Sequence, residues 1–239
     1  GQVGEAQDAR IQQKRWAALA AQRQYTGYQL FQHRWEKKYR KPLGEGCPKM
    51  NSDIDQTVYM LGMLSGLQAM TNDINSGGAV HVPKDIAAIV ERGMTCLNNE
   101  KFWGAPEATR AVIWTLLPGA GDGKPDPYQT LKQSMHIGEN KGVRLSHALY
   151  AVAAQASGED AKIRDALKAF SHARSDEKPV NPQFKLIDAM AGSMVQGISD
   201  RYWTEHTGVR TGDQQRFWDE QDNSSELDDL FNEDTAAQL

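Results

Sequence analysis

Apolar side chains recur at intervals of three and four residues along most of this chain, and this pattern limits the possible folds more than any other feature. Such spacing places apolar groups on one side of an α-helix, whereas a half-buried strand would alternate apolar and polar residues. Convincing alternation is almost absent. The clearest helical stripe lies within residues 183–203 and consists of Phe184, Ile187, Met190 or Ala191, Met194, Val195, Ile198 and Tyr202. We therefore predict an all-α protein with this stripe in its core.

Glycine and proline residues divide the chain into a series of expected helices. The first runs from about Arg10 to Tyr39, and its aromatic residues are spaced as on a buried helix face: Trp16, Tyr28, Phe31, Trp35 and Tyr39. The second runs from Asp53 to about Met70 and has one apolar face made of Ile54, Val58, Leu61 and Leu64. Later helices are expected at about 85–94, 105–117, 126–137, 142–155, 159–173 and 183–203.

One segment has the spacing of a helical repeat. The second helix of a tetratricopeptide repeat has an alanine, a phenylalanine four residues later and an alanine three further on, and Ala166, Phe170 and Ala173 match this pattern before Pro179. Weaker echoes occur at Ala88, Arg92 and Thr95 and at Thr130, Ser134 and Ile137. We expect antiparallel helix pairs stacked as a degenerate tetratricopeptide-like α-solenoid. Helix pairs of some other all-α bundle remain an open alternative.

The composition is that of a globular protein, but charge is placed unevenly along the chain. Hydrophobic residues make up 39% of the sequence, and no apolar run is long enough to span a membrane. Residues 10–41 contain nine basic side chains against the single acid Glu36, and residues 213–239 contain nine acids against Arg216 alone. The net charge of −4 argues against nucleic acid as a partner. The two charged ends are expected either to dock on each other, within or between subunits, or to attach separately to partners.

These patterns divide the chain into three expected parts. Residues 1–46 form a basic N-terminal helical extension, residues 47–207 a helical-repeat domain, and residues 208–239 an acidic C-terminal tail. The tail has a short amphipathic face, which we expect to dock on a groove or on the basic helix of a neighbouring subunit: Leu227, Leu230 and Phe231.

The glycine-rich stretch "LPGAGDGKPDPYQTLK" raises the question of a phosphate-binding loop. A nucleotide P-loop needs a glycine five residues before a Gly-Lys-Ser/Thr sequence, but Gly123-Lys124 is followed by Pro125 and preceded at that position by Pro118. A dinucleotide fingerprint fails as well, because no third glycine follows at the required spacing and no βαβ unit surrounds the stretch. We predict a connector between two helices.

Other residue types give no pattern that points to a metal, a cofactor or catalysis. The six histidines are scattered without a pair at helical spacing, and the methionine spacing is that of core filling. No serine-hydrolase elbow or HExxH motif occurs. Cys47 and Cys96 are the only cysteines, and their type and spacing leave open whether they form one disulfide or remain two buried thiols. We therefore expect no metal, no cofactor and no catalytic residues.

Five segments resemble one known family in their order and spacing. They are "VPKDIAAIVERGMTCLNNEKFWGAP", a helix ending in "LPG", the stretch "DPYQTLKQSMHIGENKGVRLSHALYA", "IRDALKAFSHA" and "LIDAMAGSMVQGISDRYW". Together they resemble the periplasmic T component (TatT-like) of tripartite ATP-independent periplasmic (TRAP) transporters, over roughly three-fifths of the chain.

The resemblance implies a periplasmic protein of tetratricopeptide-like helix pairs that forms homo-oligomers, trimers among them, and binds the solute-receptor (P) subunit of the transporter. It brings no catalytic residues. Membrane attachment would come only through a lipid anchor, for which this sequence has no N-terminal cysteine. A periplasmic address would favour a disulfide between Cys47 and Cys96.

We accordingly expect a non-enzymatic accessory protein of such a transport system that presents a concave or pore-like surface to a partner protein. Trp103, Arg110, Trp114 and Tyr150 are the candidate contact residues, because aromatic side chains and arginine often anchor interfaces. The competing interpretation of Trp114 and Tyr150 is that they fill the core between repeats. The alternative function is a carrier whose helical cavity binds a small hydrophobic or metal ligand.

Overall fold

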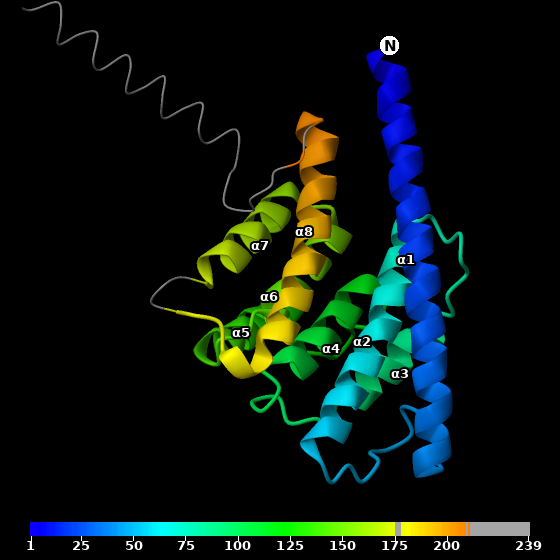
Figure 1. Cartoon of the computed structure of the whole chain (residues 1–239), viewed down its shortest axis with the longest axis vertical. Coiled ribbons are helices and arrows are strands. Elements are labelled where there is room, and N and C mark those ends of the chain that lie inside the picture. Colours follow the sequence, from blue (N-terminus) through cyan, green and yellow to red (C-terminus); the bar gives the residue numbers. More distant parts are fainter. Residues whose placement is uncertain (175–177, 209, 211–239) are drawn as a thin grey trace, which may run out of the picture.

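The computed structural model describes residues 1–174, 178–208 and 210, and in these residues it is all-helical (Figure 1). This confirms the predicted fold class. The chain forms a series of α-helices and one short 3-10 helix, Pro182–Phe184: α1 Gln2–Tyr39, α2 Asp53–Asn75, α3 Asp85–Met94, α4 Ala105–Leu116, α5 Pro127–Asn140, α6 Leu145–Ser157, α7 Asp160–His172 and α8 Lys185–Thr207. No strand occurs among the described residues.

Local sequence signals set several of the helix ends. The Ser52 hydroxyl accepts a hydrogen bond from the Asp55 backbone nitrogen at the start of α2, at 3.1 Å. Asp126 caps α5 in the same way, through the Gln129 nitrogen at 2.8 Å. Gly158 follows the end of α6 with a φ of 67°, a left-handed conformation that glycine adopts without steric cost. The caps explain why the predicted starts of α2 and α5 agree with the structure.

The first two helices form a long antiparallel pair. The Lys38 ammonium binds Asp55 at one end of the pair, and the side-chain amides of Gln24 and Asn72 meet at the other end. The helices approach closely because α2 has glycine where α1 has large aromatic rings. A Cβ atom built on Gly66 would lie 2.7 Å from the Tyr28 ring, and real side chains do not approach so closely.

The remaining helices extend this pair into one continuous core. Helix α2 packs on α3, α3 on α4, α4 on α5 and α6, and α6 on α7 and α8. The largest fully buried side chains include Trp103, Tyr28, Tyr59 and Phe170. The repeat-signature residues Ala166, Phe170 and Ala173 are all buried, with Ala166 and Phe170 almost completely enclosed. Helix pairs packed in this order fit the predicted helical-repeat architecture.

Two expected helix faces are only partly buried. Tyr28 and Trp35 of α1 are buried, but Trp16 is 66% exposed. The reason is that α1 is much longer than α2, so its N-terminal half extends beyond its antiparallel partner (Figure 1). On α2 the buried side carries Tyr59, Met60 and Met63, while Ile54 and Val58 of the expected apolar face are exposed.

Helix α1 contributes to the same core as the helices that follow it. Tyr28 and Trp35 belong to one buried cluster with residues from α2 to α8. The packing therefore crosses the expected boundary at residue 46. The acidic tail lies outside the described residues, apart from Gly208, which caps α8, and Arg210. In the described part of the chain, no helix combines the length and the apolar character that a membrane span requires.

Candidate functional site

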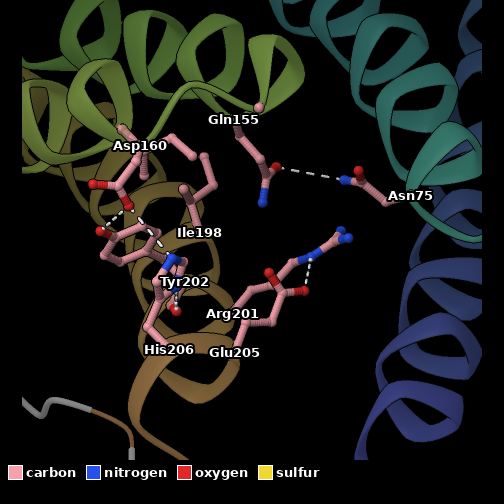
Figure 2. A pocket seen from close by; sticks show the side chains of 10 residues that line it. Asn75, Gln155, Asp160, Ile198, Arg201, Tyr202, Glu205 and His206 are labelled. Atoms are coloured by element: carbon pink, nitrogen blue, oxygen red, sulfur yellow. Dashed lines mark hydrogen bonds and ion pairs between the residues drawn. The ribbon is translucent and has the colours of Figure 1, made fainter.

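A pocket of about 260 Å³ lies where the end of α2, the turn between α6 and α7, and the last turns of α8 meet (Figure 2). We call this pocket the α2–α8 cleft. Its lining residues are Asn75, Gln155, Gly158, Asp160, Ile163, Ile198, Arg201, Tyr202, Glu205 and His206. They come from segments far apart in the sequence, so only the fold brings them together.

The helices position these side chains through their periodicity and one turn. Ile198, Arg201, Tyr202 and Glu205 recur at three- and four-residue intervals, which brings them to one side of α8. Gly158 ends α6 in a left-handed conformation and allows α7 to begin at Asp160. As a result, Gln155 in the last turn of α6 and Asp160 in the first turn of α7 line the same pocket.

One wall of the cleft is a hydrogen-bond network that joins α7 to α8. The Tyr202 hydroxyl donates to Asp160 Oδ1 at 2.5 Å, and the His206 Nε2 lies 3.4 Å from the same oxygen. The other imidazole nitrogen, Nδ1, lies 2.7 Å from the Tyr202 carbonyl oxygen, and the two rings stack with centroids 4.2 Å apart. Burial raises the pKa of Tyr202, and its hydrogen bond to the Asp160 carboxylate raises it further. Tyr202 is thus a proton donor fixed in place, rather than an ionised group.

The opposite wall is also polar. Asn75 Nδ2 donates to Gln155 Oε1 over 3.5 Å and bridges α2 to α6 (Figure 2). Arg201 Nε donates to Glu205 Oε1 at 3.1 Å. Ile198 is buried beneath these groups, and Ile163 is partly buried. The cleft therefore combines charged and amide groups with an apolar floor, which suits a ligand that has both characters.

The aromatic residues expected to contact a partner lie in the core instead. Trp103 is 2% exposed, packs against the Phe184 ring at 4.7 Å, and accepts a hydrogen bond on its carbonyl oxygen from Ser146. Tyr150 is 3% exposed and donates to Asp165 at 2.6 Å; burial raises its pKa, and this hydrogen bond adds to the effect. Large aromatic rings stabilise a fold most when they are buried between helices and shielded from water, which explains why Trp103 and Tyr150 lie in the core. The surface assignment of Trp103 and Tyr150 is corrected accordingly.

Trp114 and Arg110 belong to a structural cluster around Glu91. Trp114 is 6% exposed, and its Nε1 donates to Glu91 Oε1 at 3.2 Å, which corrects its expected surface position. Arg110 binds Glu91 at 3.0 Å and Glu107 at 2.9 Å. Burial raises the pKa of Glu91, but the hydrogen bonds from Trp114 and Arg110 outweigh it and leave this pKa lowered. The cluster fixes α3 to α4, and none of its residues lines the α2–α8 cleft.

The glycine-rich stretch between α4 and α5 is attached to this cluster. Lys124 lies 3.5 Å from Glu91, and Gly119 and Gly123 adopt positive φ angles of 78° and 70°. The ion pair and the two glycine conformations make this stretch a turn between α4 and α5, in agreement with its interpretation as a connector.

Cys47 and Cys96 are joined by a disulfide in the structure, with Cα atoms 5.3 Å apart. The bond connects the segment after α1 to the residues that follow α3. Next to it, Arg92 Nε donates to the Gly44 carbonyl oxygen at 3.0 Å. Both contacts stabilise the long connection between α1 and α2.

A buried ion pair between α6 and α8 was not anticipated from the sequence. The guanidinium of Arg144, at the start of α6, binds both carboxylate oxygens of Asp188, at 3.0 and 2.7 Å, and lies 4.0 Å from the Phe170 ring centroid. The side chains are 11% and 5% exposed. In the sequence, only one feature indicated this pair: an acid, Asp188, stands next to Ile187 within the apolar stripe of residues 183–203. The cleft residues gave a weaker signal still, because polar side chains at a helix end are usually solvated.

The fold and the cleft define an all-α protein of packed helix pairs with a mixed polar and apolar pocket. Comparisons with protein-family models, curated proteins and solved structures found no match. Within the described residues, no group of three or more His, Cys, Asp or Glu side chains is placed to hold a metal ion.

Proposed function

We propose that this chain is a non-enzymatic helical-repeat protein that binds a partner protein through the α2–α8 cleft. The observation that supports this proposal is the cleft itself, which opens where the ends of α2, α6 and α8 and the start of α7 meet. Stacked helix pairs commonly bind partners on such concave surfaces. The bound segment would displace the long Asn75–Gln155 contact and occupy the space in front of Arg201.

We further propose a periplasmic location and an accessory role in a TRAP-type solute transport system, with the solute-receptor subunit as partner. The resemblance of the five sequence segments supports this role. The Cys47–Cys96 bond supports the location, since disulfides persist in oxidising compartments. Assembly into a homo-oligomer, such as a trimer, rests on the resemblance alone.

The test is capture from periplasmic extract with the purified chain as bait, followed by mass spectrometry of the eluted proteins. We expect a solute-binding receptor to be recovered by the wild type and lost by the double variant Gln155→Ala/Arg201→Ala. The matched control is Gln12→Ala/Arg34→Ala, which changes the same residue types on exposed positions of α1. Equal recovery by both double variants would exclude the cleft as the binding surface.

The second candidate function is a carrier of a small ligand. It is favoured by the apolar floor of the cleft, where Ile198 and Tyr202 are buried and Ile163 is partly buried. Native mass spectrometry of the purified protein separates the two functions. A carrier is expected to retain a bound mass, and elemental analysis of the same sample would identify a metal.

A further inference from the structure

Two hydrogen-bond donors face into the α2–α8 cleft from different helices. Arg201 binds Glu205 only through Nε, and its two terminal nitrogens have no partner within the described ranges 1–174, 178–208 and 210. Gln155 uses its amide oxygen to accept from Asn75, and within the same ranges its amide nitrogen has no partner. Figure 2 shows both groups directed into the space between α6, α8 and the end of α2.

The acidic groups of the cleft are already engaged as acceptors. Asp160 accepts from the Tyr202 hydroxyl and lies close to His206 Nε2, and Glu205 accepts from Arg201. A ligand that supplied only donors would compete with these contacts. A ligand that supplied acceptor oxygens would instead satisfy the free donors of Arg201 and Gln155.

The geometry of a guanidinium favours one kind of acceptor. Its terminal nitrogens form a planar fork that matches the two oxygens of a carboxylate, and charge-assisted hydrogen bonds of this kind are stronger than neutral ones. Glu205 binds on a different side of the guanidinium, at Nε, so it leaves this fork available while lowering the positive charge of the site.

The size and floor of the cleft limit the rest of the ligand. Its volume of about 260 Å³ is below the range of roughly 300–1,000 Å³ that drug-sized ligands usually occupy. Ile163 and Ile198 provide an apolar surface next to the donors. A short branched hydrocarbon group beside the carboxylate would cover both isoleucines.

We infer that the α2–α8 cleft binds a carboxylate that carries a short apolar group, held by Arg201 and Gln155. This inference rests on the proposed function, in which the same cleft is the binding surface. Two sources supply this chemistry: a free organic acid, and the C-terminal residue of a polypeptide. The arms of the experiment below distinguish them.

The experiment is isothermal titration calorimetry of the full chain with two matched pairs of probes. The first pair is 4-methylpentanoate and its neutral amide, and the second is N-acetyl-leucine and N-acetyl-leucinamide. Each acid is expected to bind at least about tenfold more tightly than its amide, because hydrogen bonds to charged groups are the stronger ones. Tighter binding of N-acetyl-leucine points to a polypeptide terminus, and tighter binding of 4-methylpentanoate points to a free acid.

Three variants assign the effect to residues. Arg201→Gln is expected to weaken acid binding at least about tenfold. Glu205→Gln, which keeps an acceptor near Arg201 Nε but removes a negative charge, is expected to bind the acids at least as tightly as the wild type. Arg34→Gln, on the exposed side of α1, is the control and is expected to bind like the wild type.

The inference would be overturned by acids and amides that bind equally, or by acid binding that Arg201→Gln leaves unchanged. Failure of all four probes to bind would overturn it as well. Partner capture by the wild type is measured independently, so the proposed function would still stand in each of these cases. Circular dichroism of each variant verifies that the fold is intact.

Discussion

Arg144 and Asp188 show how a single buried pair connects two helices of this protein. The guanidinium binds both carboxylate oxygens, and the two side chains are largely enclosed. Removing one charge from such a pair leaves the other buried without compensation, whereas replacing both by apolar groups removes the desolvation penalty together with the attraction. The pair therefore matters most when only one of its members is changed.

We predict that Asp188→Asn lowers the free energy of unfolding by about 3–5 kcal/mol. Urea denaturation followed by circular dichroism measures this. The double variant Arg144→Met/Asp188→Leu is expected to lose much less, because no unpaired charge remains. The prediction fails if Asp188→Asn differs from the wild type by less than about 1 kcal/mol, or if the double variant is the less stable of the two.

His147 makes a second residue-scale prediction, which concerns pH. It is 2% exposed, and burial lowers its pKa to about 4, while the charges of Glu139 and Asp188 act to raise it and that of Arg144 to lower it. The unfolded chain therefore binds a proton near pH 6.5 that the folded chain rejects. Stability from this group is present above pH 6.5 and is lost as the pH falls from about 6.5 to 4, by about 3 kcal/mol in total.

The measurement is a series of urea denaturation curves between pH 7.5 and 4 for the wild type and for His147→Leu. Carboxylates also titrate over this pH range in both proteins. The informative quantity is therefore the difference between the two proteins in how their free energy of unfolding depends on pH. We expect the variant to lose less stability than the wild type over this range. Parallel curves would show that His147 does not contribute.

At the scale of elements, the α1–α2 pair depends on close contact between glycine and aromatic residues. Gly62 and Gly66 have no side chains that would separate the helices, and the rings of Phe31 and Tyr28 occupy the space they leave. Trp16, in the N-terminal half of α1, is 66% exposed because α1 is longer than α2 and extends beyond it.

Gly66→Ala is expected to destabilise the protein by about 1–3 kcal/mol through overpacking against Tyr28, although alanine favours the helix itself. The control is Gly197→Ala on α8, where an added Cβ would meet nothing within 4 Å. That variant should gain up to about 1 kcal/mol from helix propensity. Thermal unfolding of both proteins measures the effects, and equal shifts in Tm would refute the packing argument.

At the scale of the whole molecule, the Cys47–Cys96 bond closes a loop that includes all of α2 and α3. The sequence separation of 49 residues is large, so the bond restricts the unfolded chain considerably. We predict that Cys47→Ser/Cys96→Ser lowers the free energy of unfolding by about 2–4 kcal/mol. Reduced wild-type protein should behave like the double variant, and a stability equal to that of the oxidised wild type would contradict the prediction.

The acidic tail gives a prediction about assembly, although it lies outside the described residues. If it docks on the basic α1 of the same or a neighbouring subunit, deletion of the residues after Gln221 should lower oligomer stability, and added salt should reduce the difference. Analytical ultracentrifugation at low and high salt measures this. An oligomer unaffected by the deletion would remove the tail from assembly.

The sequence by itself determined the helices, their order and the core stripe of α8, because helix periodicity and caps are properties of neighbouring residues. It also excluded a phosphate-binding loop at residues 117–132. Only the tertiary structure decided that Ile54 and Trp16 are exposed while Trp103 is buried, since burial depends on which helix covers a given face. The α2–α8 cleft is likewise a feature that only the tertiary structure decided. Asn75, Gln155 and Arg201 each look like a solvated residue near a helix end in the sequence, and they form a site only because the ends of α2, α6 and α8 meet.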